Sequence, residues 1–270
     1  MSSGSKQILL IAGAVILTAG LYFAPKKVNN QVTVESESGV SFESLLKEAK
    51  GQLKRQELDP INRVEDALEK APDSNELTDS LGKMWDRVNM PYISAHYYEE
   101  LASKSSEEKS WINAAYRYYD AFRMTGDSTL RKMLVDKAIT CYKKVLEINP
   151  NNLDAKTDLG LCYAEGTSSP MQGIMMLREV VKQDPEHKTA QFNLGVLSVK
   201  SGQYEKAVER FEKVLQIDPQ NKEARYLLGR TYMMMGKNEL ALQTLNQLKK
   251  SDDPQFNKEV NTLINQINNH

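Results

Sequence analysis

Residues that could carry catalysis or bind a metal are few in this chain, and they are scattered. The three histidines are His96, His187 and His270, and none of them has a second ligand at metal-binding spacing. No Gly-x-Ser-x-Gly motif, phosphate-binding loop or His-Glu-x-x-His motif occurs. The sequence therefore offers no catalytic, cofactor-binding or metal-binding residue, and we predict that the protein is not an enzyme.

Two cysteines, Cys141 and Cys162, are the remaining reactive side chains. They fall in neighbouring predicted helices, and no histidine stands near either in the sequence, which disfavours a catalytic thiol. Each is most simply a small buried apolar residue. A disulfide between them remains an alternative if the protein resides in an oxidising compartment.

Charge and composition point to helices and away from nucleic acid. The net charge of the 270 residues is −1, the two signs are interspersed, and no basic stripe appears, so we expect no nucleic-acid partner. Leu, Ala, Lys, Glu, Gln and Met are abundant, and β-branched runs are few, which favours helix throughout. The length allows one or two domains.

The strongest signal in the sequence is a repeat of 34 to 35 residues between about residues 149 and 254. Large, small and helix-ending residues recur together with this period, and such a period predicts stacked helical hairpins. The recurring residues are Pro150, Pro185, Pro219 and Pro254; Leu159-Gly160, Leu194-Gly195 and Leu228-Gly229; Ala138, Gly173, Ala207 and Ala241; Tyr142, Leu177, Phe211 and Leu245.

The unit at 188–219 shows how one hairpin is encoded. A first helix ends at Ser201-Gly202, since glycine tolerates the left-handed turn at a helix C-terminus. A second helix begins at Tyr204, and Asp218-Pro219 stops it. This pattern resembles the tetratricopeptide repeat family, although Ser198 stands where the family has an aromatic residue.

The resemblance implies an all-α fold, a right-handed superhelix of stacked helix-turn-helix hairpins. Within residues 41–74 we expect a capping pair of helices, an atypical first hairpin broken at Asp59-Pro60. The predicted repeats are residues 75–107, 108–150, 153–185, 188–219 and 222–252, and residues 253–270 form a closing helix that covers the last repeat.

The N-terminal segment predicts a membrane anchor. Ile8–Ala24 carries no charge and, as a helix, would be about 26 Å long, the short end of a membrane span. We assign 1–27 to this anchor and 28–40 to a polar linker; a cleaved signal peptide and a buried core helix are the alternatives. Positive charges are equally numerous on the two sides of the segment, so they do not fix its orientation. We expect a bacterial inner-membrane protein with a periplasmic soluble part.

In the family, first helices line the concave side of the superhelix, and the resemblance implies a partner-binding groove there. Phe192, Val196 and Val199 form a second apolar stripe on one predicted helix, which favours an apolar peptide over simple packing between hairpins. Carried over position by position, the groove comprises Ile112, Tyr116, Tyr119, Leu161, Phe192, Val196, Val199, Tyr226 and Met233, with Asp79, Lys83, Asp86 and Arg87 at one end and Lys200 and Arg230 at the other.

We therefore predict a non-catalytic, membrane-tethered scaffold that binds proteins or peptides during assembly of envelope or membrane complexes. Capture of a chaperone's C-terminal carboxylate is disfavoured, because Leu161 and Val196 stand where that activity wants asparagine. The alternatives are an organellar import receptor facing the cytosol, a self-assembling structural protein and an enzyme subunit. Membrane topology would test the first, and mass in solution would test the second.

Overall fold

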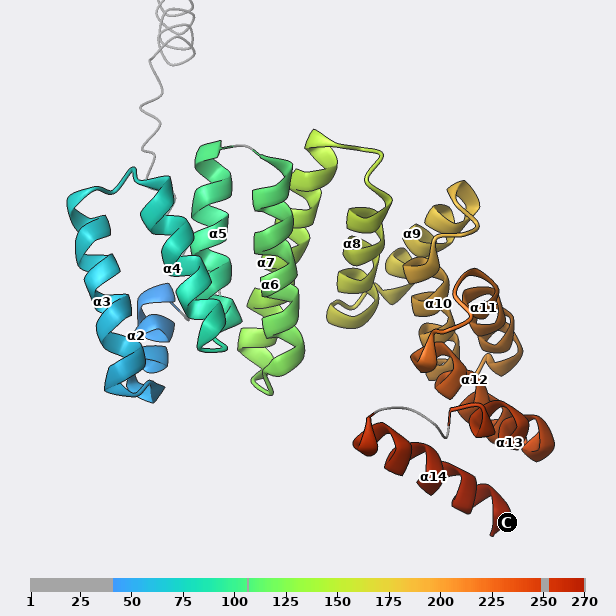
Figure 1. Ribbon diagram of the computed structural model, residues 1–270. Helices are drawn as coiled ribbons and strands as arrows, with labels where there is room; N and C mark the ends of the chain where they lie inside the picture. Colours follow the sequence, from blue (N-terminus) through green and yellow to red (C-terminus); the bar gives the residue numbers. More distant parts are fainter. Residues whose placement is uncertain (1–40, 106, 249–252, 270) are drawn as a thin grey trace, which may run out of the picture. The chain divides into compact units, whose positions relative to one another are not determined.

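The computed structural model describes residues 41–105, 107–248 and 253–269, and these residues form helices and turns without any strand (Figure 1). The all-α prediction is confirmed for them. The predicted anchor and linker lie outside the described residues. The helices are α2 (Phe42–Gln52), α3 (Arg55–Lys70), α4 (Asn75–Arg87), α5 (Pro91–Ser105), α6 (Glu108–Met124), α7 (Ser128–Ile148), α8 (Leu153–Gly166), α9 (Pro170–Gln183), α10 (Lys188–Lys200), α11 (Tyr204–Ile217), α12 (Lys222–Met234), α13 (Asn238–Asn246) and α14 (Pro254–Asn268).

Consecutive helices pair as hairpins, and each hairpin packs on the next. We call α4, α6, α8, α10 and α12 the first helices; their hairpin partners α5, α7, α9, α11 and α13 are the second helices. Each second helix also contacts the first helix of the following hairpin, and α6, α8, α10 and α12 contact one another in succession. Side chains at equivalent positions of consecutive first helices from α6 to α12 therefore lie on helices that contact each other.

Glycine in the repeat allows close packing inside each hairpin. A Cβ atom on Gly195 of α10 would lie 2.7 Å from the ring of Phe211 on α11, so the missing side chain makes room for a large one. A Cβ atom on Gly173 of α9 would lie only 2.1 Å from the carbonyl oxygen of Gly160 on α8. Small residues thus serve two purposes: they admit aromatic side chains, and they let two backbones touch.

The core is a succession of apolar clusters that follow the hairpins. One cluster joins α2 to α5, a second joins α5 to α8, a third lies between α9 and α10, and a fourth joins α11 to α14. In the last cluster Val260, Leu263, Ile264 and Ile267 of α14 are buried, while the remaining α14 positions are mostly polar and exposed. The helix α14 therefore covers the apolar side of the last hairpin, as a closing helix must.

No helix within the described ranges is both long and apolar enough to cross a lipid bilayer.

The expected break at Asp59-Pro60 is wrong. Helix α3 begins at Arg55 and runs through Pro60. The carboxylate of Glu57 accepts a hydrogen bond from the backbone N–H of Lys54 at 3.0 Å, and this bond helps to fix the helix start upstream of the proline. The proline then removes one interior hydrogen bond, a cost that the burial of Ile61 helps to offset.

The expected first hairpin of α2 and α3 is also wrong in its pairing. The backbone of α2 approaches α5. The ring of Phe42 stacks on the imidazole of His96 with 3.5 Å between centroids. Contact with α3 comes from side chains, including an ion pair between Lys50 and Glu65. Both helices thus pack on the first repeat, α2 against α5 and α3 against α4.

Candidate functional site

The residues predicted to line a groove lie on the first helices, and we call this set the first-helix face. Tyr116 on α6 is its most prominent apolar member, since 59% of this residue is exposed. Arg230 on α12 is also exposed, whereas Tyr119 is buried. The half-buried members are Ile112, Leu161, Phe192, Val196, Val199, Tyr226 and Met233.

Several apolar side chains of this face also take part in packing. The ring of Phe192 meets that of Phe211 edge-on at 5.9 Å between centroids. The ring of Tyr226 lies 5.9 Å from that of Phe256 on α14. Both residues are half-buried, so part of each contributes to the core and part is exposed to solvent. Packing and binding are therefore compatible roles for the same residue.

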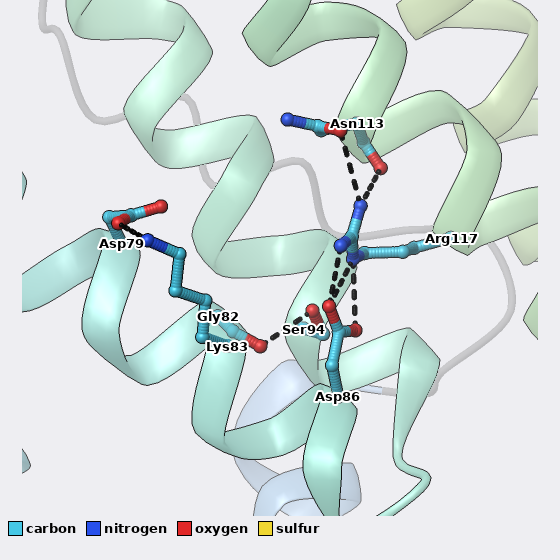
Figure 2. Close-up of polar contacts among 7 residues, drawn as sticks. All are labelled: Asp79, Gly82, Lys83, Asp86, Ser94, Asn113 and Arg117. Atoms are coloured by element: carbon cyan, nitrogen blue, oxygen red, sulfur yellow. Dashed lines mark hydrogen bonds and ion pairs between the residues drawn. The ribbon is translucent and has the colours of Figure 1, made fainter.

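The polar end of the face is organised by Arg117, a residue that the sequence did not single out. Its guanidinium group donates from Nε and Nη2 to the carboxylate of Asp86, at 2.5 to 2.9 Å, and so joins α6 to α4 (Figure 2). Its Nη1 donates to the backbone oxygen of Asn113 at 3.1 Å. The predicted carboxylate of Asp86 is thus already paired, and Arg117 has its main hydrogen-bonding directions satisfied.

Arg117 of α6 also packs against the first repeat, which comprises α4 and α5. Its guanidinium carbon lies 4.2 Å from the ring centre of Tyr98, and that ring fills the space where a Cβ atom on Gly82 would be. The hydroxyl of Ser94 donates to the Gly82 carbonyl at 2.8 Å, as Figure 2 shows. At this end of the face, Lys83 forms an ion pair with Asp79, one turn earlier on α4, and 61% of the Lys83 side chain is exposed.

A second polar link joins three first helices. The carboxylate of Glu165 on α8 accepts from the hydroxyl of Tyr119 on α6 at 2.7 Å and from the ammonium of Lys200 on α10 at 2.5 Å. Burial raises the pKa of Glu165, but these two donors outweigh burial, so its pKa lies below the usual value. The carboxylate is therefore ionised at neutral pH and pairs with the predicted far-end cation Lys200, whose side chain stays 59% exposed.

One sequence signal could have found both links. Asp86 and Arg117 are 31 residues apart, and Glu165 and Lys200 are 35 apart, which is about one repeat period. In a stack of hairpins, opposite charges at that separation fall on neighbouring first helices. The pattern therefore predicts ion pairs between repeats, which sequence reasoning about single helices does not consider.

The side chains with catalytic chemistry do not gather. The described residues hold no group of three or more His, Cys, Asp or Glu arranged for a metal ion. Cys141 and Cys162 are both free and buried, and burial raises the pKa of each thiol far above its ordinary value. Both sulfurs are therefore protonated and unreactive at neutral pH.

Comparison with known proteins agrees with this hairpin architecture. Three tetratricopeptide repeat family models match the chain, over residues 134–152, 166–221 and 198–267. The chain carries tetratricopeptide repeats. Such repeats are generally non-catalytic scaffolds for protein–protein interaction. No curated protein sequence matches the chain.

Solved structures share the same repeat fold at low sequence identity. A tetratricopeptide repeat protein from Parabacteroides merdae is 17% identical, with 84% of this chain and 92% of that chain covered and a TM-score of 0.56. TTC0263 of Thermus thermophilus is 16% identical, with 71% and 96% covered and a TM-score of 0.52. MamA from Desulfovibrio magneticus is 19% identical, with 67% and 98% covered and a TM-score of 0.52. These similarities establish the tetratricopeptide repeat fold alone.

Proposed function

We propose that this protein is a membrane-tethered scaffold that binds an extended or helical peptide segment of a partner protein along the first-helix face. The observation that carries the proposal is Tyr116, a large aromatic side chain with 59% of the residue exposed on a first helix. Leu161 and Val196 follow one repeat apart on α8 and α10 and are half-buried. Tyrosine is enriched among the residues that contribute most to binding at protein interfaces, and the apolar neighbours add surface that can be shielded from water.

The polar links support the proposal because they leave the middle of the face apolar. Asp86 and Arg117 neutralise each other, as do Glu165 and Lys200, so little net charge is directed at the central apolar residues. Arg117 and Lys200 already pair with carboxylates of the protein, so a carboxylate of a ligand would have to displace one of these partners. The face therefore favours apolar side chains over a charged chain end. Arg230 remains exposed near the far end of the face and can steer an acidic flank.

A pull-down from intact cells tests the proposal with two matched variants of the full-length chain. Val196→Glu places a carboxylate on the first-helix face, and Met175→Glu places one on the second helix α9, where 63% of the residue is exposed. We expect a discrete partner to be recovered with the wild type and with Met175→Glu and to be lost with Val196→Glu. Equal recovery with both variants would remove the first-helix face as the binding site, provided that both melt like the wild type.

The membrane tether is a separate part of the proposal and rests on the uncharged run Ile8–Ala24. Anchoring would raise the local concentration of the scaffold near membrane partners. Fractionation after carbonate extraction tests it: the full chain should stay with the membrane, and a chain beginning at Ser41 should not. Protease access in intact cells and in spheroplasts then distinguishes a periplasmic scaffold from an import receptor facing the cytosol.

A further inference from the structure

The start of α10 differs in chemistry from the starts of the neighbouring first helices. The N-cap residues of α8, α10 and α12 are Asn152, His187 and Asn221, which occupy the same place in three consecutive repeats. Each side chain accepts a hydrogen bond from the backbone N–H three residues later, at 2.8, 3.3 and 2.8 Å. The middle repeat therefore uses an imidazole nitrogen where its neighbours use an amide oxygen.

The two kinds of acceptor respond differently to acid. An amide oxygen accepts a hydrogen bond at any ordinary pH, whereas an imidazole nitrogen accepts only while it carries no proton. In His187 the Nδ1 atom accepts from Ala190, and Nε2 lies 3.3 Å from a carboxylate oxygen of Asp154. Protonation of the neutral ring adds a hydrogen to Nδ1. That hydrogen points at the backbone N–H of Ala190, from which Nδ1 accepted a hydrogen bond before protonation.

Charged groups around His187 come from several elements. Asp154 of α8 faces Nε2 and has 86% of its side chain exposed, so its attraction for a protonated ring is weakened by solvent. Asp158, also on α8, is a second carboxylate that interacts with His187, and it accepts a hydrogen bond from Tyr142 of α7. From the preceding turn, Glu186 is engaged by Lys213 of α11 at 3.8 Å.

We propose that protonation of His187 releases the N-cap of α10, so that the junction between the α8–α9 and α10–α11 hairpins loosens in mildly acidic solution. His187 has only 10% of its side chain exposed and lies in the turn between the two hairpins, so the released cap is not replaced freely by water. The same first turn leads into Phe192. If the proposed function is correct, acid therefore also weakens the centre of the binding face.

Exchanging the N-cap residues between neighbouring repeats provides matched variants for the test. His187→Asn gives α10 the cap that α8 and α12 already have, and Asn221→His transfers the imidazole cap to α12. Amide hydrogen exchange of the full-length protein in detergent would be followed by mass spectrometry at about pH 7.5 and about pH 5, after correction for intrinsic exchange. Both variants retain Asp158, but His187→Asn also removes the influence of the imidazole on that carboxylate, so Asn221→His, which keeps His187, is the variant in which Asp158 is left unchanged.

We expect the first turn of α10 in the wild type to lose protection roughly fivefold on acidification, the scale of one lost helix cap. The same turn in His187→Asn should keep its protection, and Asn221→His should move the loss to α12. Equal acid sensitivity of α10 in the wild type and in His187→Asn would overturn the proposal, and so would unchanged protection of α10 in the wild type.

Discussion

Replacing Asp158 with asparagine should stabilise the protein at neutral pH. Asp158 lies in α8 with most of its surface covered, and its carboxylate accepts a hydrogen bond from the hydroxyl of Tyr142 at 3.2 Å. Burial raises the pKa of Asp158 from the ordinary 3.8 to about 6, although the Tyr142 hydrogen bond opposes the rise. The folded protein therefore holds a charge at neutral pH in a place that favours the neutral acid.

The sign and size of the effect follow from proton linkage. Because the folded-state pKa is above the unfolded-state pKa, the folded state binds the proton more tightly, and this stabilisation is complete only below the unfolded-state pKa. It is lost as the pH rises from 3.8 through about 6 and does not return at higher pH. At about 1.4 kcal/mol per pKa unit, the difference corresponds to about 3 kcal/mol.

Urea unfolding followed by circular dichroism, between about pH 4 and pH 7.5, measures the effect. The amide oxygen of the introduced asparagine can still accept a hydrogen bond from Tyr142. We therefore expect Asp158→Asn to gain up to about 3 kcal/mol in unfolding free energy at pH 7.5 and almost nothing near pH 4. A variant that is less stable at pH 7.5, or one whose difference from the wild type does not change with pH, would refute the reasoning.

Three further predictions concern packing and reactivity. Gly173→Ala should lower the unfolding free energy by about 3 kcal/mol or more in urea titrations, since its Cβ atom would lie 2.1 Å from a backbone oxygen of α8. Arg117→Met should cost about 1 to 3 kcal/mol by leaving Asp86 without its partner, and Asp86→Asn in the same background should recover part of it in a double-mutant cycle. A thiol reagent at pH 7.5 should leave Cys141 and Cys162 unmodified in the folded protein and label both in urea; rapid labelling without urea would contradict their burial.

The hairpins could be predicted from the sequence because each repeat restates the same local rules. Gly202 adopts a positive φ of 71° at the end of a first helix, and Pro150, Pro185 and Pro219 each stand two residues after the end of a second helix. A signal that recurs three or four times is much harder to produce by chance than one cap or one turn. This is why α8 to α11 follow the pattern closely, whereas α13 already ends at Asn246 and Pro254 begins α14.

The N-terminal helices could not be predicted in the same way because they depend on contacts outside the repeat. Pro60 suggested a helix boundary, yet tertiary burial of Ile61 and the Glu57 cap carry α3 through it. The position of α2 depends on the stacking of Phe42 on His96, two residues 54 positions apart in the chain. No periodic pattern marks such a pair.

The binding face was only partly accessible to sequence reasoning for a related reason. Periodicity placed Tyr116, Phe192 and Val196 on first helices, which the structure bears out, but periodicity cannot say how much of each side chain the next repeat covers. That share depends on neighbours such as Phe211 and Phe256, whose rings meet first-helix side chains from other helices.

Partner binding at the first-helix face is the central claim, and crosslinking at Phe192 tests it most directly. A photoreactive residue would replace Phe192 in the full-length protein in intact cells, and Met175 on α9 would provide the control position. The account predicts a discrete crosslinked partner at Phe192, absent from the Met175 control and absent when Val196 is also changed to glutamate. Crosslinks from Phe192 only to this same chain would contradict the account, because the face would then be occupied by the protein itself.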